Sequence, residues 1–174
     1  MRDLLDRIYL GAGWIAAFVI LAIAVLVSAQ VLLNFTTRVL GLPLPSTIPS
    51  YADFSGFMLA AATFLAMPYT FRSGGHIKVS LITSRLSLRW QLWAELCALA
   101  VAAALVGFAC YFTVALVLES WHYNDVSPGI VPIPLWLPQS VMAFGLILLL
   151  VAIVDSLVQT YRQGTPVIAA SEEA

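Results

Sequence analysis

The sequence has 174 residues, of which 61% are hydrophobic and only 10% are charged. A soluble domain is about half apolar and about a quarter charged, so this chain has too few charged side chains to cover a surface that faces water. A net charge of −1 without a basic patch also excludes a nucleic-acid-binding protein. The composition therefore predicts an all-α integral membrane protein whose parts outside the membrane are short loops.

Four charge-free windows are long enough to cross a membrane, which takes roughly 20 apolar residues. They predict four transmembrane helices in a single membrane domain, residues 1–174, with limits near residues 11–33, 51–71, 94–118 and 137–161. We expect the first span to be retained, because its apolar run of about 20 residues exceeds the core of a signal peptide. The polar C-terminal residues, 163–174, are predicted to form a loose tail.

The basic residues predict the orientation of these spans. Seven of the eight lie in the N-terminal segment, the second loop and the C-terminal tail, which four spans place on one side of the membrane. The first loop holds only Arg38, and the third loop holds acidic residues but no basic one. The positive-inside rule therefore predicts a multi-pass protein of the bacterial inner membrane with both termini in the cytoplasm.

The second loop, residues 76–93, mixes basic and apolar side chains. The apolar ones recur at helical spacing, at Ile82, Leu86, Trp90 and Trp93. This pattern predicts a short amphipathic helix that lies in the cytoplasmic interface and runs into the third span. Arg85 and Arg89 would then meet anionic lipid headgroups, at about 1 kcal/mol each. The alternative is a connecting loop that is basic only because it is cytoplasmic.

The first loop contains three prolines, so it is not helical throughout, and the second span begins after it. Ser50 can cap this helix, and Asp53 falls in its first turn, where the helix dipole favours an acid. Asp53 is therefore either a residue that helps the helix to begin or a contact at the outer surface.

The span centres hold no acidic, basic or histidine side chain. This argues against a stand-alone proton-coupled carrier or small exporter, which places ionisable groups inside its spans. Gln30, one of the few polar residues in a span, is a candidate for binding a neighbouring helix. The sequence thus predicts a membrane protein without an active site of its own, and such proteins are often subunits of a larger assembly.

A four-helix redox subunit linked to haem or quinone is the main alternative. A haem would need histidines on facing helices, and the two histidines lie in loops on opposite sides of the membrane. Cys97 and Cys110 are separated by about 20 Å of one helix, so they cannot form a disulfide with each other. We therefore predict no catalytic, cofactor-binding or metal-binding residue and no enzymatic activity.

One stretch of the second loop, Arg72 to Val79, resembles the signature of a known family. The stretch reads Arg-Ser-Gly-Gly-His-Ile-Lys-Val and directly follows the second span. Further resemblances lie at Asn34 and Arg38, from Ile48 to Asp53, and from Ser127 to Trp136. Together they cover about residues 34–161 and resemble the DctQ-like family, the small membrane subunit of tripartite ATP-independent periplasmic (TRAP) transporters. Where the family usually has Asp after the Val, this chain has Ser80.

The resemblance implies a subunit of a sodium-coupled, binding-protein-dependent secondary transporter for organic acids. It implies that this chain packs on and anchors a large multi-span membrane subunit, which binds the sodium and the substrate, and that this chain carries no substrate itself. A periplasmic substrate-binding protein and the lipid bilayer are the other expected partners. The candidate residues for contacts with partners or lipid are Arg38, Asp53, Arg72, His76, Lys78, Arg85 and Arg89.

These candidates divide by side. Arg72, His76 and Lys78 are expected to fix the cytoplasmic turn after the second span and to contact the large subunit or lipid. Arg38 and Asp53 are expected at the outer surface, where the large subunit or the binding protein would meet them.

Overall fold

The computed structural model describes residues 2–73 and 87–163. This part of the chain contains four helices, α1 (Arg2–Arg38), α2 (Tyr51–Arg72), α4 (Leu88–Tyr123) and α5 (Trp136–Gln163). All four are long and apolar enough to cross a membrane. The prediction of an all-helical protein with four helices that are long and apolar enough to span a membrane is therefore confirmed.

Most of the helices extend beyond the predicted span limits. The first covers 37 residues and the third covers 36, because a helix continues past the hydrocarbon into the polar interface, where a charge-free window stops. The end of the predicted interfacial segment, Leu88 to Trp93, forms the first turns of α4. Residues 74–86, which make up most of that segment, and the predicted tail beyond residue 163 lie outside the described residues, so the interfacial helix stays a prediction.

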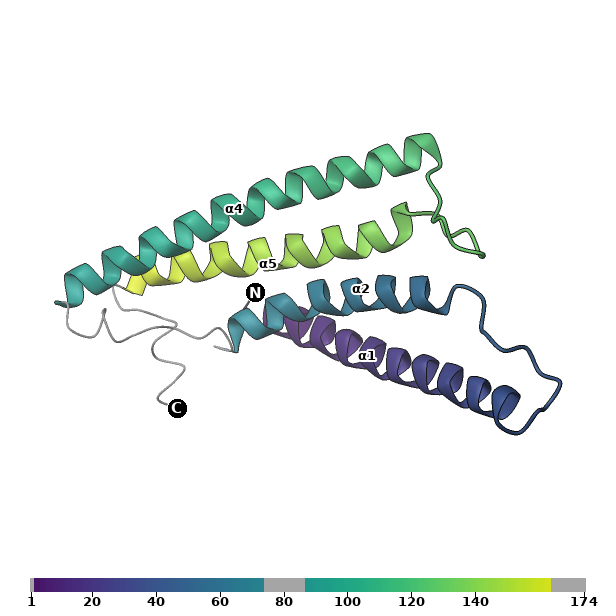
Figure 1. Cartoon of the computed structure of the whole chain (residues 1–174). Coiled ribbons are helices and arrows are strands. Elements are labelled where there is room, and N and C mark those ends of the chain that lie inside the picture. The colour runs from purple at the N-terminus through teal and green to yellow at the C-terminus, as the bar shows by residue number, and fades with distance from the viewer. Residues whose placement is uncertain (1, 74–86, 164–174) are drawn as a thin grey trace.

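The helices pack in the order α1, α2, α5, α4 (Figure 1). Each helix packs mainly on its neighbours in this row, so α2 and α5 lie in the middle and α1 and α4 lie at the two sides. The chain runs back and forth through the row. One end, which we call the Arg72 end, is where α1 and α4 begin and α2 and α5 end. The opposite end, the Ser50 end, carries the first and third loops.

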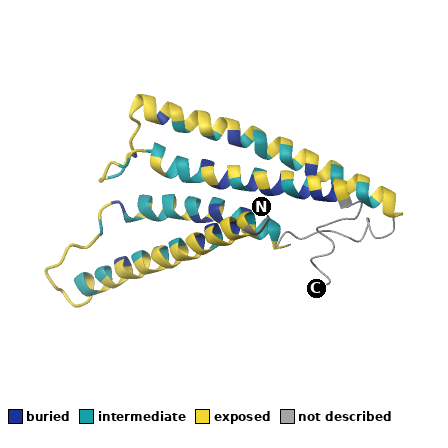
Figure 2. Ribbon diagram, turned by 180° about the vertical axis from the view of Figure 1, so that it is seen from behind, coloured by how far each residue is buried: buried dark blue, intermediate teal, exposed yellow. Residues whose placement is uncertain are grey.

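The buried core is small and consists of two clusters. Ala12 and Ala16 of α1 pack against Ala62 and Leu65 of α2. Between α4 and α5 a second cluster contains Leu99, Leu149 and Ile153. Apolar side chains cover most of the remaining helix surface and are exposed, above all along the two outer helices α1 and α4 (Figure 2).

Small residues set the closest helix contacts. Gly13 of α1 makes one of them, because a Cβ added at Gly13 would lie 3.2 Å from the ring of Tyr69 on α2. The closest approach, however, is at Gly145, where an added Cβ would lie 2.5 Å from the backbone oxygen of Phe64. The absence of a side chain at Gly145 allows α2 and α5 to touch at the centre of the row. No sequence pattern predicted this role for Gly145.

The first loop is held by the helix that precedes it. Gln30 Oε1 accepts a hydrogen bond from the backbone N–H of Ile48 at 2.7 Å, and its Nε2 donates to the carbonyl of Ser46 at 3.3 Å. Gln30 is 3% exposed. A loop rich in proline offers unpaired backbone groups, and the amide of Gln30 satisfies two of them. A contact of Gln30 with a neighbouring helix stays a prediction.

Candidate functional site

Three helices meet at the guanidinium of Arg72, the last residue of α2. Its Nη2 lies 3.4 Å from Oδ1 of Asp6 on α1, and its Nη1 lies 3.4 Å from Oδ2 of Asp155 on α5. Nη1 also donates to the hydroxyl of Ser156 at 3.5 Å. A basic residue suits the end of a helix, where the carbonyls carry partial negative charge. Arg72 therefore joins α1, α2 and α5 at one end of the molecule.

The polar surroundings of Arg72, which we call the Arg72 cluster, also include Tyr9 and Gln159. The amide of Gln159 donates to Asp155 Oδ2, so that carboxylate has two partners. Ser156 and Tyr9 are only 2% and 1% exposed. Removing one charge from such a partly buried network leaves the others uncompensated, which costs more than the loss of an exposed ion pair.

The composition of the Arg72 cluster suits a structural role. It contains one guanidinium and two carboxylates, and in the part of the chain that the structure describes no three His, Cys, Asp or Glu side chains gather as metal ligands would. The arrangement can hold helix ends together.

The opposite end is held by the third loop. The backbone N–H of Val131 donates to Ser50 Oγ at 2.9 Å, directly before α2 begins. Asp53 lies in the first turn of α2 as predicted, and Gly129 of the loop lies against its carboxylate and the Ser50 hydroxyl. Ser50 makes no side-chain capping bond, which corrects the prediction that it caps α2. It adopts a left-handed backbone conformation, φ 54°, and its hydroxyl faces the loop instead.

Ser127 organises the third loop internally. Its hydroxyl accepts from the backbone N–H of Ile133 at 3.0 Å and donates to the carbonyl of Val131, and an isolated bridge pairs Val126 with Pro134. This folded loop is what presents Val131 to Ser50, so a segment between α4 and α5 contacts the start of α2.

The structure does not bring the seven predicted interface residues together. Arg72 and Arg89 lie at the Arg72 end, whereas Arg38 and Asp53 lie at the Ser50 end. Both Arg38 and Arg89 are exposed. The remaining three, His76, Lys78 and Arg85, lie outside the described residues. The guanidinium of Arg72 is engaged within the chain, while its predicted contact with a partner or lipid stays a prediction.

The acids that pair with Arg72 were not singled out from the sequence. A signal was present, because Asp6 precedes the first predicted span and Asp155 lies near the end of the fourth, which places both on the same side as Arg72. What the sequence lacked was the packing order that makes α2 the neighbour of both α1 and α5.

Comparison with known proteins identifies the family. The family model of the DctQ component of tripartite ATP-independent periplasmic transporters matches residues 23–163, which includes the second part of α1, from residue 23 onward, and the whole of α2, α4 and α5. No curated protein and no solved structure matched the chain. The family is not enzymatic, which confirms the prediction that the chain has no enzymatic activity and removes the redox alternative. The chain belongs to the DctQ family and is the small membrane component of a TRAP transporter.

Proposed function

We propose that this chain packs on and anchors the large membrane subunit of its transporter and carries no substrate itself. The observation that carries this proposal is the distribution of charge and apolar surface. The charged side chains of the four helices lie toward their ends, and the buried polar contacts hold the chain's own helices and loops together. A substrate or ion path through the chain would need ionisable groups at mid-membrane.

The two outer helices offer the surface for such packing. The outer helix α4 exposes a row of large apolar side chains, including Val101, Leu105, Phe108 and Phe112. Lipid can cover these side chains as well as protein can, and packing between helices in lipid depends on shape and small residues. An open row of helices, rather than a closed bundle, leaves both sides of the molecule free for a neighbour.

The finer parts of the proposal come from the family resemblance and the charge pattern. The tripartite system implies two partners, a large membrane subunit and a periplasmic binding protein. We infer that the transporter takes up organic acids and is driven by sodium. The large subunit holds both the substrate site and the sodium site. The excess of basic residues supports cytoplasmic termini, which places Arg38, Asp53 and the third loop on the periplasmic side, where the binding protein docks.

Co-purification tests the anchoring. An affinity-tagged copy of this chain, expressed with the large subunit of its own transporter, should retain that subunit in stoichiometric amount after detergent extraction. Phe108→Gln places a polar group on the exposed face of α4 and should lower the amount of large subunit retained. Thr63→Gln, at an exposed position of α2, is the control and should leave that amount unchanged. A chain that purifies alone, folded and free of the large subunit, would contradict the proposal.

A further inference from the structure

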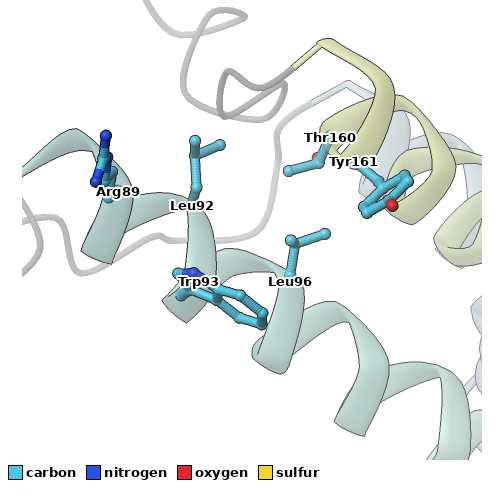
Figure 3. A pocket seen from close by; sticks show the side chains of 6 residues that line it. All are labelled: Arg89, Leu92, Trp93, Leu96, Thr160 and Tyr161. Atoms are coloured by element: carbon cyan, nitrogen blue, oxygen red, sulfur yellow. The ribbon is translucent and has the colours of Figure 1, made fainter.

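A small hollow lies between the start of α4 and the end of α5, at the Arg72 end (Figure 3). It has a volume of about 170 Å³ and is lined by Arg89, Leu92, Trp93, Leu96, Thr160 and Tyr161. A second hollow of about 410 Å³ shares Arg89 and Trp93 with the first. The guanidinium and the indole therefore stand between two adjoining spaces.

The side chains around the first hollow come from two helices. Arg89 and Leu92 project from α4 on the same side, while Thr160 and Tyr161 face them from α5 (Figure 3). Leu96 lies between the two groups, and Thr160 is fully buried. The hollow is thus a gap where the last turn of α5 no longer fills the space beside α4.

Its chemistry changes along the helix axis. Arg89 is the second residue of α4, and Leu96 lies seven residues further along, about 10 Å deeper into the span at the rise of an α-helix. The wall is therefore charged at the end of the span and apolar toward its interior. A phospholipid has the same order of groups, with a charged phosphate at the membrane surface and an apolar acyl chain deeper in the membrane.

Aromatic side chains mark this depth as the boundary of the bilayer. Trp93 and Tyr161 are 65% and 76% exposed, and such side chains prefer the headgroup region of a membrane. An arginine at this depth favours negative charge and can donate several hydrogen bonds to one phosphate.

We propose that this hollow binds one anionic phospholipid of the adjoining leaflet, with Arg89 on the phosphate and the acyl chain along Leu92 and Leu96. The proposal goes beyond the anchoring function and does not depend on it, because it requires only that the chain is embedded in a membrane. It assigns Arg89 to one defined lipid rather than to headgroups in general.

The test is a lipid titration of the delipidated full-length chain in detergent, followed by native mass spectrometry with phosphatidylglycerol. The wild-type chain should bind one lipid more tightly than the next. Arg89→Gln should weaken that first binding about fivefold, the effect expected of one basic residue at an anionic surface. Arg162→Gln is the matched control, because Arg162 is exposed at the same end but does not line the hollow. Equal losses in the two variants would overturn the proposal.

A second pair of variants tests the apolar part. Leu96→Trp fills the hollow and should abolish the tight first binding, whereas Leu105→Trp, on the exposed surface of the same helix, should retain it. Helical circular dichroism establishes that each variant is folded. Millimolar inorganic phosphate should not displace the lipid. Displacement by phosphate alone would show a free-anion site, and tight lipid binding that persists in folded Leu96→Trp would place the lipid elsewhere; either result overturns the proposal.

Discussion

The inner helix α5 and the outer helix α4 differ in burial far more than in composition. Both pass as membrane spans on length and apolarity, yet 44% of the most apolar window of α5 is buried inside the protein, against 6% for α4. The difference follows from their neighbours, because α5 packs on both α2 and α4 while α4 packs mainly on α5. Apolarity thus identifies a span, and it does not identify which side of that span is covered by protein.

The boundary between α2 and α5 explains how the row is held together. It is fixed at three levels: by Arg72 with Asp155 at one end, by Gly145 against the backbone of Phe64 in the middle, and by Ser50 with Val131 at the other end. The outer face of α4 has no comparable set of contacts among the described residues. Substitutions at the boundary should therefore cost stability, and substitutions on the outer face of α4 should not.

The largest effect is expected at Gly145. In Gly145→Ala the new Cβ would meet the backbone of Phe64, which can move only if the helices separate, so we expect the free energy of unfolding to fall by about 2–3 kcal/mol. Gly56→Ala is the matched control, because nothing lies within 4 Å of its added Cβ. That control should be neutral or up to about 1 kcal/mol more stable. Equilibrium unfolding in detergent micelles measures both, and equal stabilities would show that α2 and α5 do not touch there.

The next effect concerns the Arg72 cluster. Arg72→Gln and Asp155→Asn should each destabilise the chain, and the double variant should lose less than the sum of the two, with a coupling energy of about 1–2 kcal/mol. Asp6→Asn should couple more weakly, because the side chain of Asp6 is 53% exposed and that of Asp155 only 24%. A double-mutant cycle on the free energy of unfolding measures these terms. Additive losses would mean that the guanidinium and the carboxylate do not interact.

The contact at the Ser50 end should matter less. Ser50→Ala removes the acceptor for the Val131 N–H and should cost about 1 kcal/mol. Hydrogen exchange at that amide should rise together with exchange in the rest of the third loop. An unchanged exchange rate in the variant would show that another group holds the loop.

The smallest effect is expected on the outer face of α4. Leu105→Ala should change the stability of the isolated chain by less than about 0.5 kcal/mol, because Leu105 is 65% exposed. The buried Leu149→Ala is its comparison on α5 and should cost several times more. Similar losses in the two variants would mean that the two helices are buried alike.

The sequence predicted the number of helices because a membrane span needs a long charge-free run, and this requirement acts on each helix separately. It did not predict that the helices extend to Arg2 and Tyr123, because polar interfacial residues are helical without being apolar. The sequence also did not predict the order of the four helices in the row. Alternating orientation places residues at one end or the other, and it leaves open which spans are neighbours.

The candidate site shows the same limit. Arg72 was singled out from its position after the second span, and its acid partners were not, because Asp6 and Asp155 are separated from it by 66 and 83 positions in the sequence. The role of Ser50 differs from the prediction because the local sequence favours a helix cap, whereas a loop 81 residues away uses the hydroxyl. Contacts between distant segments are decided by packing, which the local pattern does not contain.

Reconstituted uptake tests the central claim, that the chain supports a carrier without being one. Proteoliposomes would contain this chain, the large subunit, or both, with the transporter's own binding protein and its radiolabelled organic-acid ligand outside and an inward sodium gradient. We predict uptake with both membrane subunits and none above empty liposomes with this chain alone. Sodium-driven uptake by this chain without the large subunit would contradict the account.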